Sequence, residues 1–191
     1  MSEINIGNPV PLGSSITPNG VNFSIVATNA ELIEILIFEK SNSLSPQKVY
    51  RLNSNFKSGP YWHAEIKGLK EGTIYGYRIY QKKDGINKDY SKKILIDPCS
   101  REITGWENYC RNNSINDREN LNSCLKSVVC KRDRFDFKHF PRPRHKWEET
   151  IIYELHVKAF TENQKSVNNF TEESCFTKII QKIPYLQEIG I

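Results

Sequence analysis

The chain has 191 residues, of which 38% are hydrophobic, 11% aromatic and 26% charged. It is too short for a complete (β/α)8 barrel joined to a second domain, since such barrels alone need about 250 residues. The apolar content suffices for a core, which argues against wholesale disorder. No apolar run approaches the roughly 20 residues that cross a bilayer, and residues 1–10 lack a basic and apolar signal segment. We therefore expect a cytoplasmic protein with no membrane partner.

The formal net charge of +5 is confined to one stretch. Residues 131–146 hold seven Lys or Arg and two Asp, an excess of five, and the remaining 20 basic residues are balanced by 20 acidic ones. Phenylalanines are interleaved with these charges, as in a groove for single-stranded nucleic acid. No nucleic-acid-binding motif accompanies the stretch, so we interpret it as a solvated linker and expect no nucleic-acid partner.

The five cysteines are spaced irregularly and include no C-x-x-C pair: Cys99, Cys110, Cys124, Cys130 and Cys175. This spacing predicts neither a zinc site nor a disulfide framework, so we expect reduced thiols. Nothing in their neighbourhood indicates an activated thiolate. We predict that the chain holds no metal and no cofactor.

The first hundred residues predict short strands separated by turns. Residues 21–25 alternate apolar and polar side chains, the period of a half-buried strand. Residues 32–38 form a nearly continuous apolar run that suits a strand better than a helix. Three further strands are predicted, at residues 48–52, 61–66 and 73–81. The expected fold is mainly β, with an immunoglobulin-like antiparallel β-sandwich over residues 1–98.

Residues 99–146 are expected to form an irregular linker. They are rich in Asn, Ser and charged residues, and no period of 2 or 3.6 persists in them. Pro141 and Pro143 favour extended backbone, which places a boundary near residue 145. A segment with a different pattern then follows, over residues 147–191.

Residues 147–191 predict one α/β unit. Residues 151–157 suit a strand, and Thr171 suits the cap of a helix whose apolar face continues to Ile183. Pro184 interrupts or restarts this helix, and Gly190 suits its C-terminal cap. A βαβ unit needs a second strand to bury its helix, and the sequence ends one residue into that strand. We therefore expect the sequence to be truncated.

Several segments, in the same order along about 180 residues, resemble the glycogen debranching and isoamylase-type enzymes of the alpha-amylase superfamily. The early segments resemble the family 48 carbohydrate-binding module of these enzymes: Pro11-Leu12-Gly13, Val21-Asn22-Phe23-Ser24, Trp62-His63, Gly68-Leu69, Tyr75-Gly76-Tyr77-Arg78 and Ile96-Asp97-Pro98. The late segments resemble the entry into the first two strands of their barrel: residues 147–158, which contain Tyr153-Glu154-Leu155-His156-Val157, and residues 183–191. Ala159 departs from the family, which has Gly there, and residues 100–130 match no part of its pattern.

The resemblance implies a protein that hydrolyses α-1,6 branch linkages in glycogen, amylopectin or limit dextrin. A retaining mechanism needs two carboxylates about 5 to 5.5 Å apart. In this family they come from later barrel strands, so the resemblance implies that residues 147–191 are only the start of a (β/α)8 barrel. We assign no catalytic residue. Glu154, His156 and Lys158 lie in the presumed first strand, where structural hydrogen bonds are expected of them.

Trp62 is the residue predicted to contact carbohydrate. A flat aromatic ring stacks on the apolar face of a glucose ring while polar neighbours bind its hydroxyl groups. The alternative is that Trp62 is a core or interdomain residue. Tyr61 is a similar candidate, whereas the alternation of Tyr75 and Tyr77 along their strand favours the core.

Three hypotheses remain open. The first is the N-terminal part of a debranching enzyme, inactive by itself because the catalytic carboxylates are missing. The second is a non-catalytic glucan-binding or regulatory module. The third is a nucleic-acid binder that uses residues 131–146. The first two share an α-glucan partner, and they differ in whether a catalytic barrel completes the protein.

Overall fold

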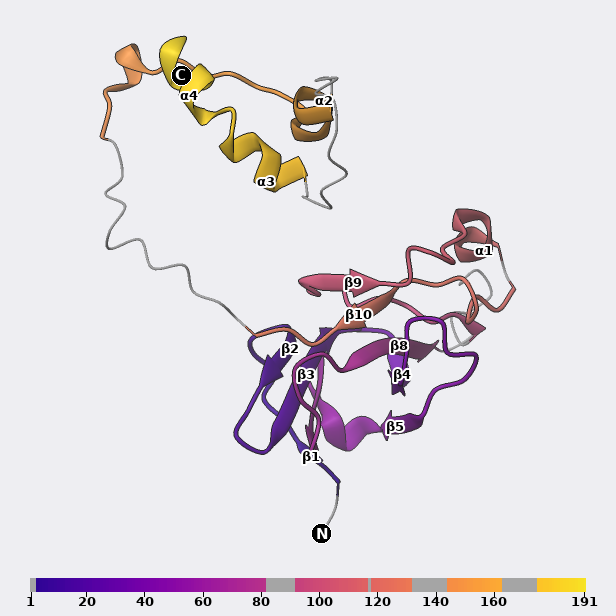
Figure 1. The fold of residues 1–191 in the computed structure, drawn as a ribbon. Helices are drawn as coiled ribbons and strands as arrows, with labels where there is room; N and C mark the ends of the chain where they lie inside the picture. Colours follow the sequence, from indigo (N-terminus) through magenta and orange to yellow (C-terminus); the bar gives the residue numbers. More distant parts are fainter. Residues whose placement is uncertain (1–2, 82–91, 117, 132–143, 163–174) are drawn as a thin grey trace. The chain divides into compact units, whose positions relative to one another are not determined.

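The strands predicted over the first hundred residues are present in the computed structural model (Figure 1). The structure describes residues 3–81, 92–116, 118–131, 144–162 and 175–191. The chain divides into two compact units, Met1–Arg134 and Phe135–Ile191. Among the described residues, no helix has the length and apolar content needed to cross a membrane.

The first unit contains two antiparallel sheets. In the first sheet the strand order is β1-β7-β3-β2, with β6 paired to β7, and in the second it is β5-β4-β8-β10-β9. The strands of the first sheet are β1 (Ile4–Ile6), β2 (Gly13–Ile16), β3 (Gly20–Val26), β6 (Lys57–Ser58) and β7 (Tyr61–Lys67). Those of the second are β4 (Ala30–Phe38), β5 (Lys48–Leu52), β8 (Ile74–Gln81), β9 (Glu102–Thr104) and β10 (Lys126–Val128). The predicted mainly β fold with an N-terminal sandwich is therefore confirmed.

One apolar cluster fills the space between the sheets. Every second residue of β3 and β4 points into it, because side chains alternate between the two faces of a strand. The cluster also includes the aromatic side chains of β7 and β8. Its buried members on these four strands include Val21, Phe23, Ile25, Ile33, Ile35, Ile37, Trp62, Ala64, Tyr75 and Tyr77.

The polar positions of β3 are buried as well, which simple alternation does not predict. Asn22 and Ser24 are buried. The Asn22 side chain donates to the Asn8 carbonyl at 3.0 Å and accepts from the Asn8 N–H at 2.7 Å, and the Ser24 hydroxyl donates to the Pro9 carbonyl at 2.6 Å. Two polar side chains thus bind the segment that precedes β2.

Residues 99–116 and 118–130 are part of the sandwich, although their sequence pattern predicts an irregular linker. They contribute β9, β10 and the short helix α1 (Arg111–Ile115). Cys124 packs with Ile94 against Leu36 and Phe38, on the face of β4 that points away from the main core. Both faces of β4 are therefore covered at this end, which explains its nearly continuous apolar sequence.

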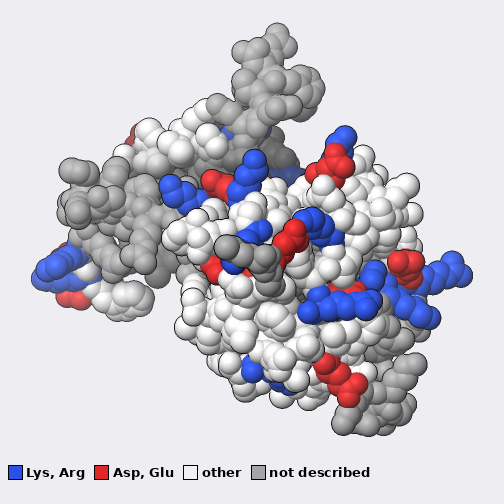
Figure 2. Space-filling view, turned by 90° about the horizontal axis from the view of Figure 1, so that it is seen from below, with Lys and Arg blue, Asp and Glu red and all other residues white. Residues whose placement is uncertain are grey.

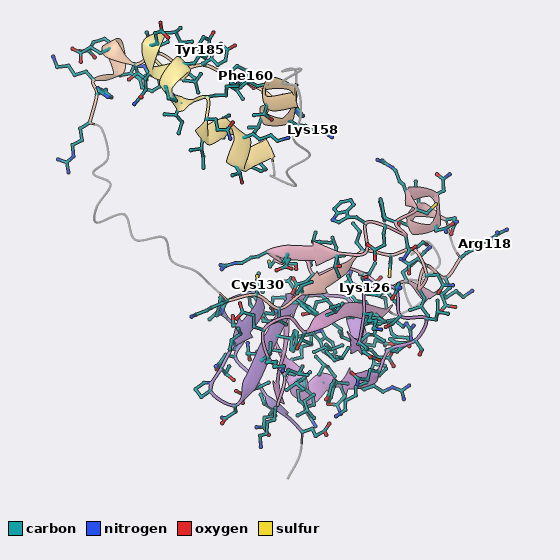
Figure 3. All side chains as sticks on the ribbon, in the orientation of Figure 1. Arg118, Lys126, Cys130, Lys158, Phe160 and Tyr185 are labelled. Carbon is teal, nitrogen blue, oxygen red and sulfur yellow. The ribbon has the colours of Figure 1, made fainter. Side chains whose placement is uncertain are left out.

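The sequence pattern does not predict β10 as a strand, because the strand begins with a lysine, Lys126. Its side chain is fully buried, and its ammonium donates to the Ser41 carbonyl at 2.7 Å and lies 4.9 Å from the centre of the Phe38 ring (Figure 3). A buried lysine bound to a carbonyl breaks the apolar pattern on which strand prediction depends. Tertiary contacts, which the local sequence does not encode, hold this strand in the sheet.

In the second unit, the strand expected at residues 151–157 does not form. Residues 151–156 have no regular structure, and the helix α2 (Val157–Glu162) begins where the strand was expected to end. A β-strand needs a neighbour to accept and donate its backbone hydrogen bonds. The described part of this unit contains no strand that could serve as that neighbour.

The two C-terminal helices agree with the sequence pattern. They are α3 (Cys175–Ile180) and α4 (Ile183–Glu188), and Pro184 lies in the first turn of α4, where a proline costs no hydrogen bond. Gly190 follows with φ of +82°, as expected of a helix-ending glycine. The Phe160 ring on α2 lies 6.4 Å from the Tyr185 ring on α4 (Figure 3). Thr171, the predicted cap, lies outside the described residues.

Candidate functional site

Trp62, the predicted carbohydrate contact, is a core residue in the structure. Its side chain on β7 is 1% exposed, and its indole N–H donates to the Ala27 carbonyl at 2.9 Å. A ring with so little accessible surface cannot stack on a sugar. The structure therefore favours the alternative stated for this residue. Tyr61, at the start of the same strand, is half-buried.

Tyr75 and Tyr77 are core residues that hold a buried carboxyl group. Their hydroxyls donate to Oδ2 of Asp97 at 2.7 and 3.4 Å, and the Cys99 N–H donates to its Oδ1 at 2.8 Å. Burial raises the pKa of Asp97, against the effect of these hydrogen bonds, and it also raises the pKa of both tyrosines. These hydrogen bonds hold the segment after β8 against the core. The cluster is buried, so a ligand cannot reach it.

Two other aromatic side chains of the sandwich are exposed, in the loop between β9 and α1. Trp106 is 63% exposed and Tyr109 is 38% exposed. Their ring centres lie 5.8 Å apart with an angle of 74° between the planes, the edge-to-face arrangement that aromatic pairs favour. We name Trp106 and Tyr109 the aromatic pair. Each ring supports the other, and much of the indole surface faces solvent.

Hydrogen bonds fix the loop that carries the aromatic pair. Before it, Gly105 is buried with φ of +97°, which favours glycine. Within it, Oε1 of Glu107 accepts from the Ser41 hydroxyl at 2.6 Å, a bond that lowers the pKa of Glu107. After it, the Cys110 N–H donates to the Ser123 carbonyl at 3.2 Å. The loop is thus attached to the β4–β5 connection and to the segment before β10.

The surroundings of the aromatic pair are hydrophilic and carry no net charge. Residues 106–113 include three asparagines, and their single acidic residue, Glu107, is balanced by Arg111. Asn108 and Asn112 are exposed, so their amide groups can both donate and accept hydrogen bonds. Flat apolar surface beside neutral amides is suited to a ligand that has apolar faces and hydroxyl groups.

The aromatic pair is not predicted by the sequence pattern, because residues 99–146 show no period and resemble a linker. A usable signal was present. Trp106 follows a glycine in a stretch without apolar period, so no strand or helix face assigns it to a core. A tryptophan in such a position is a candidate for surface recognition, whereas Trp62 lies in a predicted strand.

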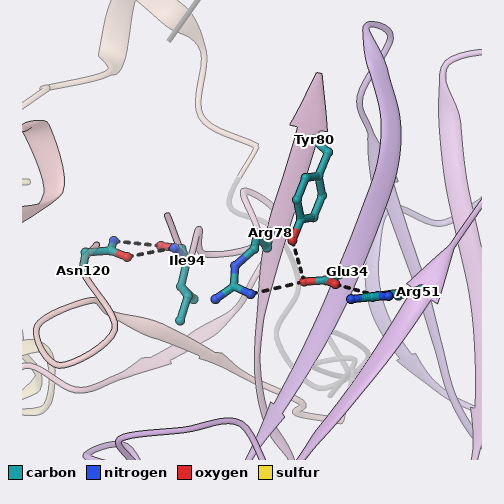
Figure 4. A network of polar contacts seen from close by, with 6 residues as sticks. All are labelled: Glu34, Arg51, Arg78, Tyr80, Ile94 and Asn120. Atoms are coloured by element: carbon teal, nitrogen blue, oxygen red, sulfur yellow. Dashed lines mark hydrogen bonds and ion pairs between the residues drawn. The ribbon is translucent and has the colours of Figure 1, made fainter. Parts of the chain in front are cut away.

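A second polar feature lies on the outer face of the second sheet, around Glu34 (Figure 4). This carboxylate on β4 is buried and accepts from Arg51 Nε at 2.9 Å, Arg78 Nη1 at 3.3 Å and the Tyr80 hydroxyl at 3.2 Å. Three donors from β5 and β8 occupy it. A single, fully bonded carboxylate is unsuited to glycoside hydrolysis, which needs a pair. The cluster therefore joins three strands.

A hollow of about 700 Å³ lies at the turns that precede β3 and follow β7. The Ser15 hydroxyl, in its wall, is buried and has no hydrogen-bond partner among the described residues. Apolar and charged groups alternate around it. Its lining includes Ile16, Pro18, Leu69, Lys70, Glu71 and Lys131.

The polar residues expected in the first barrel strand lie at and before the start of α2. The Ala159 N–H donates to Nδ1 of His156 at 3.3 Å, so this imidazole caps the helix. Glu154 and Lys158 are exposed. Within the ranges that the structure describes, no three His, Cys, Asp or Glu side chains lie close enough together to hold a metal ion.

The basic stretch at residues 131–146 is only partly described, because residues 132–143 lie outside the described ranges. On the face of the molecule in Figure 2, basic and acidic side chains are interspersed.

Both a protein-family model and curated relatives match the sequence of this chain. Residues 11–100 match the model of carbohydrate-binding module 48 (isoamylase N-terminal domain). The chain is 32% identical, over 170 residues, to a glycogen debranching enzyme of Pectobacterium carotovorum and 31% identical to one of Pectobacterium atrosepticum. These alignments cover 85% of this chain, which spans about a quarter of the length of these curated relatives.

Among solved structures, the crystal structure of the Group B Streptococcus pullulanase SAP in complex with maltotetraose is similar, with a TM-score of 0.66. The match covers 95% of this chain and 23% of the pullulanase, at 21% sequence identity. At this identity the likeness concerns the fold alone.

Proposed function

We propose that this chain, whose residues 11–100 match the model of carbohydrate-binding module 48 and which is similar to glycogen debranching enzymes, is the α-glucan-contacting N-terminal part of a protein that hydrolyses α-1,6 branch linkages. The observation that carries the proposal is the relation to two debranching enzymes, which extends well beyond the module itself.

The proposed division of labour assigns binding to the sandwich and catalysis to a barrel. The chain is proposed to consist of a module that begins with residues 1–98 and continues through β10, a connection up to residue 146, and the start of a (β/α)8 barrel over 147–191. The retaining reaction needs two carboxylates close together, and the resemblance places both on later barrel strands. The 191-residue chain is therefore expected to bind glucan and to leave branch linkages intact.

Native electrophoresis in gels with and without glycogen tests the proposal. The chain is expected to migrate more slowly in the glycogen gel, and its mobility relative to a non-binding protein is expected to fall as the glycogen concentration rises. A gel with a soluble β-glucan is the control for non-specific retardation. Equal mobility in all three gels would contradict a glucan-contacting role.

A reducing-sugar assay on glycogen limit dextrin tests the second part. No release is expected from the 191-residue chain, whereas a longer polypeptide that includes the complete barrel is expected to release linear glucans. Release by the 191-residue chain would show that the catalytic groups lie within it. Glycogen retardation without activity in the longer polypeptide would favour a non-catalytic glucan-binding module.

A further inference from the structure

We propose that the aromatic pair, Trp106 and Tyr109, is an α-glucan-binding platform. It lies outside residues 11–100, the part of the chain that matches the carbohydrate-binding module. The inference rests on the proposed function, because it specifies where the glucan binds. It names a surface to which neither the sequence pattern nor the family match assigns a role.

The first argument is the contrast in exposure between the tryptophans of the sandwich. Trp62 is enclosed, whereas Trp106 shows 63% of its surface to solvent. Exposing an indole ring costs free energy, because its apolar surface stays in contact with water. A single exposed apolar side chain is unremarkable in a folded protein, but here a second aromatic ring lies beside it. The two rings lie edge to face and both are exposed.

Second, the loop that carries the two rings is fixed by hydrogen bonds in the unliganded protein. Gly105 is buried directly before the pair, and the Cys110 N–H after it donates to the Ser123 carbonyl. Between the two rings in the sequence, Glu107 accepts a hydrogen bond from Ser41. The backbone N–H of Tyr109 also donates to the Trp106 carbonyl at 3.3 Å. A pre-organised surface loses little conformational entropy on binding. This lower cost favours the binding of ligands that make few strong contacts, such as oligosaccharides.

The third argument is chemical and identifies the ligand class. A glucose unit offers an apolar face of C–H groups, which packs on a flat aromatic ring, and a rim of hydroxyl groups. The exposed amide of Asn108, which lies between the two aromatic residues in the sequence, can supply a donor and an acceptor for such a rim. Residues 106–113 carry no net charge, as suits a neutral polyol and not a phosphate-bearing ligand. An α-linked glucan therefore fits the pair better than a nucleic acid does.

Substitutions of Trp106, measured by retardation in glycogen gels, test the platform. Trp106→Ala is expected to raise the apparent dissociation constant about five- to tenfold, while Trp106→Phe, which keeps a flat ring, loses about threefold or less. Trp106→Leu separates stacking from general hydrophobicity, since it is apolar but not flat, and it is expected to behave like Trp106→Ala. Tyr109→Ala is expected to weaken binding as well.

Trp147→Ala is the matched control. Trp147 is 81% exposed and lies in the second unit, so its loss removes an exposed indole of the same size and is expected to leave retardation unchanged. Circular dichroism checks that each variant is folded. Retardation of Trp106→Ala equal to that of the wild type would overturn the platform while leaving glucan binding intact. A wild-type chain that is not retarded would overturn the proposed function, and with it the platform.

Discussion

Five aromatic residues of the sandwich fall into two groups according to their burial. Trp62, Tyr75 and Tyr77 lie in the core, each with its polar atom bound, to Ala27 in one case and to Asp97 in the other two. Trp106 and Tyr109 lie at the surface on a loop with fixed ends. Residue type alone does not separate the groups, because an indole serves equally as core and as ligand contact.

Removal of the buried Trp62 indole is expected to lower the stability of the fold without removing a contact to glucan. Trp62→Ala leaves a cavity between the sheets, so the free energy of unfolding should fall by about 3 to 5 kcal/mol in urea denaturation. Trp106→Ala, at an exposed position, should change it by about 0.5 kcal/mol or less. A small effect of Trp62→Ala on stability, combined with a loss of glycogen retardation, would restore Trp62 as the sugar contact.

The buried carboxyl of Asp97 predicts a pH dependence of stability. Its folded pKa is raised by burial, so the folded state binds its proton more tightly than the unfolded chain does. The contribution of Asp97 to the free energy of unfolding is therefore fully present below the unfolded pKa and is lost as the pH rises through the folded pKa. Asp97→Asn, which cannot ionise, should lack this decline.

Urea denaturation at a series of pH values from the usual carboxyl range upward measures the effect. Glu107→Gln is the control, because Glu107 is exposed and its pKa is lowered, so the decline should persist in that variant. Parallel stability curves for the wild type and Asp97→Asn would show that Asp97 does not titrate differently in the folded state.

At the scale of elements, periodicity predicted the long strands and failed for the short ones. The strands β3, β4, β5, β7 and β8 follow from alternation or apolar runs. The three-residue strands β9 and β10 are too short to show a period, and Lys126 makes β10 appear polar. For residues 151–157 the pattern predicted a strand that does not form. An apolar run forms a strand only when a neighbouring strand can pair with its backbone.

The candidate site was harder to predict than the fold for the same reason. Exposure of Trp106 depends on how the loop between β9 and α1 is attached to the sandwich. The loop is bonded to Ser41, which is distant in the sequence, and to Ser123, which lies in a segment whose pattern predicts a linker. The sequence does indicate that Trp106 belongs to no apolar period. It does not indicate that Tyr109 lies against it.

Lys126 is expected to hold β10 and the β4–β5 connection together. Lys126→Ala removes the hydrogen bond to the Ser41 carbonyl and the cover of the Phe38 ring, and it leaves a cavity. We expect a loss of about 2 to 4 kcal/mol in the free energy of unfolding. Lys131→Ala, at an exposed lysine, is the control and should have little effect. Equal stability of both variants would show that the buried ammonium contributes nothing.

At the scale of the whole molecule, the chain combines a well-packed sandwich with a second unit whose described residues include no buried apolar side chain. In the second unit, the apolar side chains of Phe176, Ile180 and Ile183 are exposed. The stripe they form agrees with the helical face that the sequence predicts. Exposed apolar stripes of this kind are typical of elements that pack against further structure. The recognition chemistry proposed here lies entirely in the sandwich.

A nuclear magnetic resonance titration of the ¹⁵N-labelled chain with maltoheptaose tests whether the aromatic pair binds glucan. We expect the largest chemical-shift changes at the Trp106 indole N–H and at the backbone amides of residues 105–113, with small changes at Trp62 and Trp147. Saturable changes centred elsewhere, for example on the hollow lined by Ile16 and Leu69, or no changes at all, would contradict it.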